Sequence, residues 1–133
     1  MENDVSPDEQ ITVYLVHSSD YIPSKGRPRY AAYMPAKDKM KSVFRTTSLS
    51  HDEVRSIGSA VVEPKRGRLK GYANQTAGIM FAQSLTIVPD IIPHERHANI
   101  AGWTGYPAAD RIRAIKIAET ATLALYEPED SAI

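Results

Sequence analysis

The apolar residues of this chain change their spacing several times, and this alternation constrains the fold more than any other feature. A spacing of two, which is typical of strands, occurs in four segments, Ile11–Val16, Ser42–Thr47, Leu85–Val88 and His97–Trp103. Spacings of three and four, which are typical of helices, occur in three segments, 50–63, 74–83 and 108–125. The resulting order predicts an α+β fold with a single mixed sheet of about four or five strands and about three helices.

The clearest helix start follows Leu49. Ser50 and Glu53 have the spacing of a capping box, and Leu49 and Val54 have the spacing of a hydrophobic staple. Pro64 is expected to end this helix because the residue before a proline disfavours helical geometry. The last helix is expected from Ala108 to about Leu125, as a long C-terminal helix packed on the sheet.

The length of 133 residues suits one domain. Residues 1–10 are polar and acidic and contain Pro7, so we expect a disordered N-terminus. A single α+β domain is expected over 11–127, followed by a flexible tail at 128–133. Within the domain, residues 23–41 are rich in proline and basic residues, which predicts a long loop with one short extended piece at Tyr30–Met34.

Several classes of protein are excluded by composition. The chain has no cysteine, so disulfides, thiolate zinc sites and cysteine nucleophiles are absent. Its apolar runs are shorter than the roughly 20 residues of a membrane-spanning helix. It starts with MENDVSPDEQ, which is acidic where a secretory signal is basic and then apolar. We therefore expect a cytoplasmic protein that does not enter a membrane.

The net charge of zero conceals an uneven distribution of charge along the chain. Residues 1–24 carry five acids and no base, whereas residues 25–70 carry twelve bases and four acids. Six of these bases lie on glycine-containing loops together with Tyr72, and they form the predicted ligand-binding set: Arg27, Arg29, Lys65, Arg66, Arg68 and Lys70. Folding would gather positive charge if these loops share one face.

Two interpretations of the basic loops are open. The cations could hold phosphate oxygens of a nucleotide or, most simply, of a nucleic acid, and Tyr21, Tyr30, Tyr33 and Tyr72 could stack on bases. Alternatively, these loops are simply solvated and the lysines keep them soluble. The first interpretation predicts a small binding module for a phosphate-bearing ligand.

A second function class is suggested by the segment Pro93–Asn99. His97 could act as an acid or base, Arg96 and Arg45 could hold an anion and Asn99 could position either. A strand here would place His97 and Asn99 on one face. This predicts an enzyme acting on a phosphoester or nucleotide, although Arg45 could instead pair with Asp90 or Glu53.

Other recognised chemistry is lacking in the sequence. His94 and His97 do not have a standard metal-ligand spacing, and no phosphate-cradling glycine loop or nucleophile elbow occurs. We therefore expect neither a metal nor a cofactor. The only tryptophan, Trp103, could line a pocket, but it more simply fills the core where the last helix begins.

Three short patterns give the chain a likeness to other proteins. Ser42-Val43-Phe44-Arg45, then Leu49-Ser50 with Glu53-Val54, then Arg96-His97-Ala98-Asn99-Ile100 with Gly102-Trp103 resemble a group of small uncharacterised bacterial proteins. The likeness covers roughly residues 28–126 and implies no activity. It keeps open a third function class, an accessory subunit that docks on a partner or a second copy through Ile112, Ile115 and Leu123.

Overall fold

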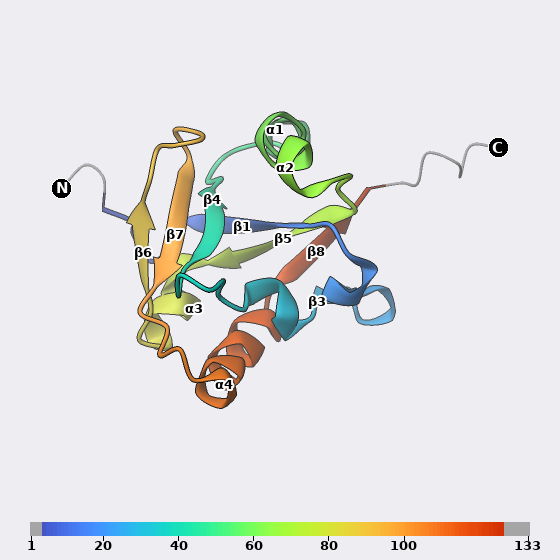
Figure 1. Cartoon of the computed structure of the whole chain (residues 1–133). Coiled ribbons are helices and arrows are strands. Elements are labelled where there is room, and N and C mark those ends of the chain that lie inside the picture. The colour runs from blue at the N-terminus through green and yellow to red at the C-terminus, as the bar shows by residue number, and fades with distance from the viewer. Residues whose placement is uncertain (1–3, 127–133) are drawn as a thin grey trace.

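A twisted antiparallel sheet with helices on both faces forms the body of the protein, whose computed structural model describes residues 4–126. The strand order is β6-β7-β4-β1-β5-β8. Figure 1 shows α1 and α2 above the sheet, and α3 and α4 below it. The α+β class is confirmed, and the layers explain why most strands are largely buried.

Six strands make the main sheet, which exceeds the four or five expected. They are β1 (Gln10–Leu15), β4 (Lys41–Arg45), β5 (Gly71–Thr76), β6 (Thr86–Pro89), β7 (His97–Ala101) and β8 (Thr122–Leu125). A separate two-stranded sheet pairs β2 (Tyr21–Ile22) with β3 (Arg27–Pro28). The extended piece expected at 30–34 is instead a 3₁₀ turn at Tyr30–Tyr33, with further 3₁₀ turns at Ser18–Asp20 and Pro23–Lys25.

The helix start at Ser50 is confirmed. Its side chain accepts a hydrogen bond from the Glu53 backbone N–H at 3.1 Å, and the Glu53 side chain accepts from the Ser50 N–H at 3.0 Å. The expected end at Pro64 is wrong: α1 (His51–Ile57) continues through a π-helical turn (Gly58–Val62) into α2 (Glu63–Arg66). Pro64 is tolerated because it lies in the first turn of α2, where no intrahelical partner for an N–H is needed.

The long C-terminal helix is not confirmed. Helix α4 spans Pro107–Ala118, and residues 122–125 leave it to form edge strand β8. The helix expected from residue 74 also begins later, because residues 71–76 form β5 and only Ala77–Ala82 form α3. Both errors arise where apolar residues of a strand continue the spacing of a neighbouring helix.

Two separate apolar clusters occupy the two faces of the sheet. On the face covered by α4, the cluster includes Ile11, Val43 and Ile117, each with an exposed fraction of 0%. On the face covered by α1, Tyr14, Phe44 and Val54 pack together and are at most 4% exposed. We call these the α4 face and the α1 face, and strand alternation assigns each strand residue to one of them.

The described part of the N-terminal segment is held against the sheet. The Gly78 N–H donates to the Pro7 carbonyl at 2.7 Å and the Ala77 N–H to the Glu9 carbonyl at 2.9 Å. The ordered part of the chain therefore begins before Ile11, whereas the sequence predicted a disordered segment over residues 1–10. The flexible tail expected at 128–133 lies outside the described residues. Within residues 4–126, no helix has the length and apolar character needed to cross a bilayer.

Candidate functional site

A concavity beside the two-stranded sheet brings together two of the predicted ligand-binding arginines. Arg27 and Arg29 line it with Tyr30, and Ile115 and Ala118 of α4 form the apolar wall. Its volume is about 200 Å³. The site thus combines two guanidinium groups, an aromatic ring and an apolar surface, which suits an anionic ligand that also has a flat apolar part.

Neighbouring charges leave this concavity positive. Its acidic lining residue, Glu119, lies 3.8 Å from the ammonium group of Lys116. The Arg111 guanidinium lies over the Tyr30 ring, 5.5 Å from its centroid, which adds a third cation nearby and restrains the ring. Tyr30 is the aromatic residue here that a ligand can reach, since its exposed fraction is 36%.

The second predicted basic segment, residues 65–70, lies next to the same edge strand. Strand β3 contacts β8 on one side, while β5 pairs with β8 on the other. The Tyr126 N–H donates to the Lys70 carbonyl at 2.9 Å, directly after β8. Close pairing requires Gly71, because a Cβ atom there would lie 2.9 Å from Cα of Leu125. Both basic segments therefore border β8.

Most cations of these two segments are free to meet a ligand. Lys65, Arg66 and Lys70 are exposed, and like Arg27 and Arg29 they make no ion pair with any residue of the described chain. Arg68 is exposed as well and has further interactions. We call the six residues together the β8 basic surface: Arg27, Arg29, Lys65, Arg66, Arg68 and Lys70.

Tyr72 does not belong to this surface, contrary to the sequence-based expectation. It is 4% exposed in the cluster on the α1 face, and its hydroxyl is 2.7 Å from Nδ1 of His51. Tyr33 is fully buried as well. Strand β5 is covered by α1 at Tyr72, and Tyr33 lies within the cluster on the α4 face, so neither ring is available to stack on a base.

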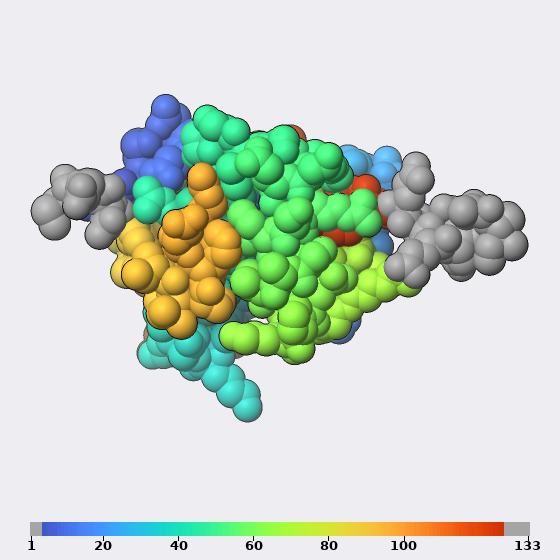
Figure 2. Space-filling model, turned by 90° about the horizontal axis from the view of Figure 1, so that it is seen from above, coloured from blue at the N-terminus to red at the C-terminus, as the bar shows by residue number. Residues whose placement is uncertain are grey.

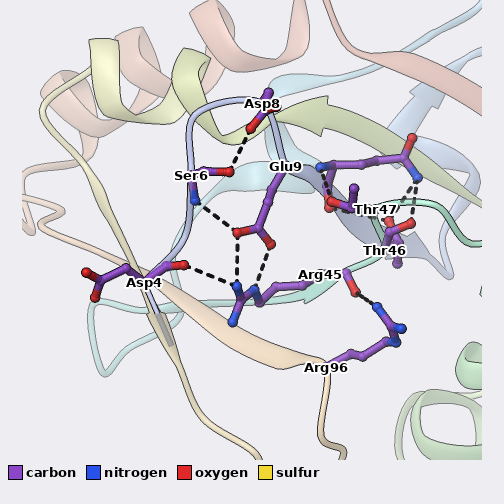
Figure 3. A network of polar contacts seen from close by, with 9 residues as sticks. Asp4, Ser6, Asp8, Glu9, Arg45, Thr46, Thr47 and Arg96 are labelled. Atoms are coloured by element: carbon purple, nitrogen blue, oxygen red, sulfur yellow. Dashed lines mark hydrogen bonds and ion pairs between the residues drawn. The ribbon is translucent and has the colours of Figure 1, made fainter. Parts of the chain in front are cut away.

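Arg45 is held by a carboxylate that the sequence did not suggest. Its Nε and Nη2 atoms donate to Oε1 and Oε2 of Glu9, each at 2.9 Å (Figure 3). Because of this contact the pKa of the Glu9 carboxyl lies below its ordinary value. The expected partners Asp90 and Glu53 are not the ones used, since Arg45 is on the α4 face with Ile11.

Arg96 lies near Arg45 but turns toward the backbone and acidic side chains. Its Nη1 donates to the Arg45 carbonyl at 3.2 Å. It also lines a hollow of about 430 Å³ with three acids, Asp52, Glu53 and Glu95. The hollow lies between α1 and the β6–β7 loop, which Figure 2 shows side by side. This setting leaves Arg96 poorly placed to hold an anion.

His97 and Asn99 share the α1 face, as the strand alternation predicted. The Cα partners across β4 and β7 are Phe44 with His97 and Ser42 with Asn99. Nε2 of His97 is 2.6 Å from Oγ of Ser42, and its Nδ1 is 2.9 Å from the Asp90 carbonyl oxygen. Arg45 points to the opposite face, so the predicted set of four catalytic residues is divided between two places.

Ser42 and Asp90 were not identified by the sequence analysis as the residues that contact His97. These contacts depend on which strands are neighbours and on the register of their pairing, and no short motif encodes either property. The alternation of Ser42 with Phe44 in one strand, and of His97 with Asn99 in another, was the available signal. It becomes informative only when β4 is known to pair with β7.

The three residues of the predicted docking surface do not form one helix face. Ile112 and Ile115 are 62% and 41% exposed on α4. Leu123 lies in β8 and packs against the cluster on the α4 face. Trp103 fills the same cluster with an exposed fraction of 5%, in agreement with the packing interpretation.

Comparisons with protein-family models, curated proteins and solved structures found no match. The function must therefore be argued from the geometry of the sites themselves.

Proposed function

We propose that the protein is a small binding module for a phosphate-bearing ligand, most simply a single-stranded nucleic acid. The observation that carries the proposal is the concavity in which Arg27 and Arg29 flank the exposed ring of Tyr30. Guanidinium groups bind phosphate oxygens through paired hydrogen bonds, and aromatic rings stack on bases of any sequence.

The second basic segment supports a ligand with more than one phosphate. Residues 65–70 border the same strand β8 and add four exposed cations to the surface. A chain of phosphates that enters the concavity can continue along this strand. A free mononucleotide would engage the concavity alone, so the two ligand classes differ in how many cations they use.

Solvated loops remain the alternative to this proposal, and the positions of the cations argue against it. Cations that only maintain solubility have no reason to line a concavity with an apolar wall, as Arg27 and Arg29 do. The phosphoester enzyme of the sequence analysis is less favoured, because Arg45 is held by Glu9 and lies on the other sheet face from His97.

Binding can be tested by fluorescence anisotropy at low salt with labelled single-stranded RNA and DNA of mixed sequence and with a labelled nucleotide. The wild-type chain is compared with Arg27→Gln/Arg29→Gln. A matched control is Lys37→Gln/Lys39→Gln, which removes two cations from the exposed loop before β4. We expect the first pair to weaken binding of every ligand at least tenfold.

The control pair is expected to bind within about twofold of the wild type, because phosphate contacts act through short-range hydrogen bonds as well as general charge. Equal losses in both double variants would show that net charge alone attracts the ligand. No binding of any ligand at low salt would refute the proposal.

A further inference from the structure

A serine, a histidine and an aspartate meet on the α1 face, away from the β8 basic surface. Ser42 is exposed on β4, and Oγ lies 2.6 Å from Nε2 of His97 on the neighbouring strand. His97 is 6% exposed. A hydroxyl within hydrogen-bond reach of an imidazole is the arrangement that activates a serine as a nucleophile.

The protonation of the imidazole follows from its other contact. Nδ1 of His97 is 2.9 Å from the Asp90 carbonyl oxygen, which can only accept a hydrogen bond. Nδ1 of the neutral ring must therefore carry the proton, and Nε2 presents a lone pair to Ser42. In this tautomer the ring can take the proton of the Ser42 hydroxyl.

Neighbouring side chains hold the His97 ring in this orientation. The Oδ2 atom of Asp90 is 3.9 Å from Nδ1 of His97, and the Asn99 amide donates to this Oδ2 at 3.4 Å. The Phe44 ring packs edge-on against the His97 ring with centroids 5.3 Å apart, which fixes the orientation of the ring. Base and orienting group are thus both in place.

The surroundings of Ser42 point to the class of substrate. Asn99 is its Cα partner on β7, and Val88, which is 49% exposed, is the Cα partner of Asn99 on β6. Side chains directly opposite one another lie on the same face of a sheet. The row across three strands is therefore neutral and partly apolar. The carboxylate of Asp90, which accepts a hydrogen bond from Asn99, lies beside the row and repels a phosphoryl group.

We infer that Ser42 is the nucleophile of a hydrolytic site for carboxylic esters with an apolar acyl group, with His97 as the base. This activity is separate from the proposed phosphate binding and does not depend on it. Val88 provides apolar surface for the acyl group. The second N–H of the Asn99 amide is the donor available for the negative oxygen of the tetrahedral intermediate.

The reaction balances with water as the co-substrate. Oγ of Ser42 attacks the ester carbonyl carbon while its proton passes to Nε2 of His97. The bond to the alcohol oxygen then breaks, and the alcohol leaves with that proton. Water, deprotonated by Nε2, attacks the acyl-serine, which releases the carboxylic acid and restores the Ser42 hydroxyl.

The full chain can be tested with a fluorophosphonate probe, which labels activated serines, and with 4-nitrophenyl butyrate as the ester. Mass spectrometry locates the adduct. We expect labelling at Ser42, no adduct in Ser42→Ala, and a labelling rate reduced about a hundredfold in His97→Gln. Arg27→Gln/Arg29→Gln should label like the wild type, which separates this result from that of nucleic-acid binding.

Two further measurements distinguish a loss of activity from a loss of folded structure. Circular dichroism and the urea midpoint show whether His97→Gln is folded. Asn99→Ala keeps the base, so it should still be labelled at Ser42 while its ester turnover falls about tenfold or more, because the oxyanion donor is missing. Labelling of Ser42 no faster than that of the exposed Ser48, or at a rate independent of pH in the wild type, would overturn the inference.

Discussion

Asp110 anchors the loop that leads into α4, and its replacement by asparagine should destabilise the protein. It is 2% exposed. Its Oδ1 accepts from the Thr104 N–H at 2.9 Å and the Thr104 hydroxyl at 2.8 Å, and Oδ2 accepts from the Gly105 N–H at 3.0 Å. Burial raises the pKa of the Asp110 carboxyl, but these hydrogen bonds outweigh it and leave the pKa below its ordinary value.

In Asp110→Asn one oxygen can still accept from Thr104, but the amide NH₂ then faces the Gly105 N–H. The loss of a hydrogen bond to a buried charged group costs about 1.5–3 kcal/mol. We therefore expect the free energy of unfolding at pH 7 to fall by about 2 kcal/mol, measured by urea denaturation. For a domain of this size the melting temperature should fall by roughly 6–10 °C.

The pH dependence gives a second check. Because the carboxyl has a lower pKa in the folded than in the unfolded protein, its contribution is complete above the unfolded pKa of about 4 and is lost as the pH falls through the folded pKa. The gap between wild type and Asp110→Asn should thus narrow at pH 3 and below. Asp38→Asn, at an exposed carboxylate that accepts from the Met40 N–H, is the control and should change stability by less than about 0.5 kcal/mol. A variant at Asp110 as stable as this control would refute the reasoning.

Three further substitutions test other contacts of the fold. Glu9→Gln removes the charge that holds Arg45, and because the ion pair is partly solvated, urea denaturation should show a loss of about 0.5–1 kcal/mol in the free energy of unfolding. Because the pKa of Glu9 is lowered in the folded protein, this loss of stability should disappear below the folded pKa, and a loss that is unchanged at low pH would contradict the ion pair. Thr12→Val removes two buried hydrogen bonds of 2.6 Å, to Thr46 and to Asn74, and should lower the free energy of unfolding by about 1–3 kcal/mol in thermal and urea unfolding. A variant as stable as the wild type would mean that these hydrogen bonds are not formed. Tyr33→Phe deletes a buried hydroxyl for which the described residues provide no hydrogen-bond partner, so urea denaturation should show an unchanged or slightly higher free energy of unfolding. A loss of more than about 1 kcal/mol would show that the hydroxyl has a hydrogen-bond partner.

The parts of the fold that could be read from the sequence are those with local causes. The capping box at Ser50 and Glu53 is complete within four residues, and β1 and β7 have strand composition over their own length. Strands β5 and β8 could not be found in this way. In β5, the successive residues Gly71 and Tyr72 are both buried, so buried and exposed positions do not alternate there. In β8, the residues after Ala118 continue the apolar spacing of the preceding helix.

The candidate sites show the same division. The basic character of the β8 basic surface is present in the sequence, because charge needs no register to be counted. The burial of Tyr72 and the pairing of Arg45 with Glu9 depend on which segments pack together, so composition alone could not predict them. The contact between Ser42 and His97 spans 55 positions in the chain and is fixed by the pairing of β4 with β7.

The most direct test of the proposed function is the slope of the logarithm of the binding constant for single-stranded nucleic acid against the logarithm of the salt concentration. If all six cations of the β8 basic surface contact phosphates, the slope should be about −4, and Arg27→Gln/Arg29→Gln should make it less steep by about 1.4. A slope near zero, or one that is the same in the wild type and this double variant, would contradict the account.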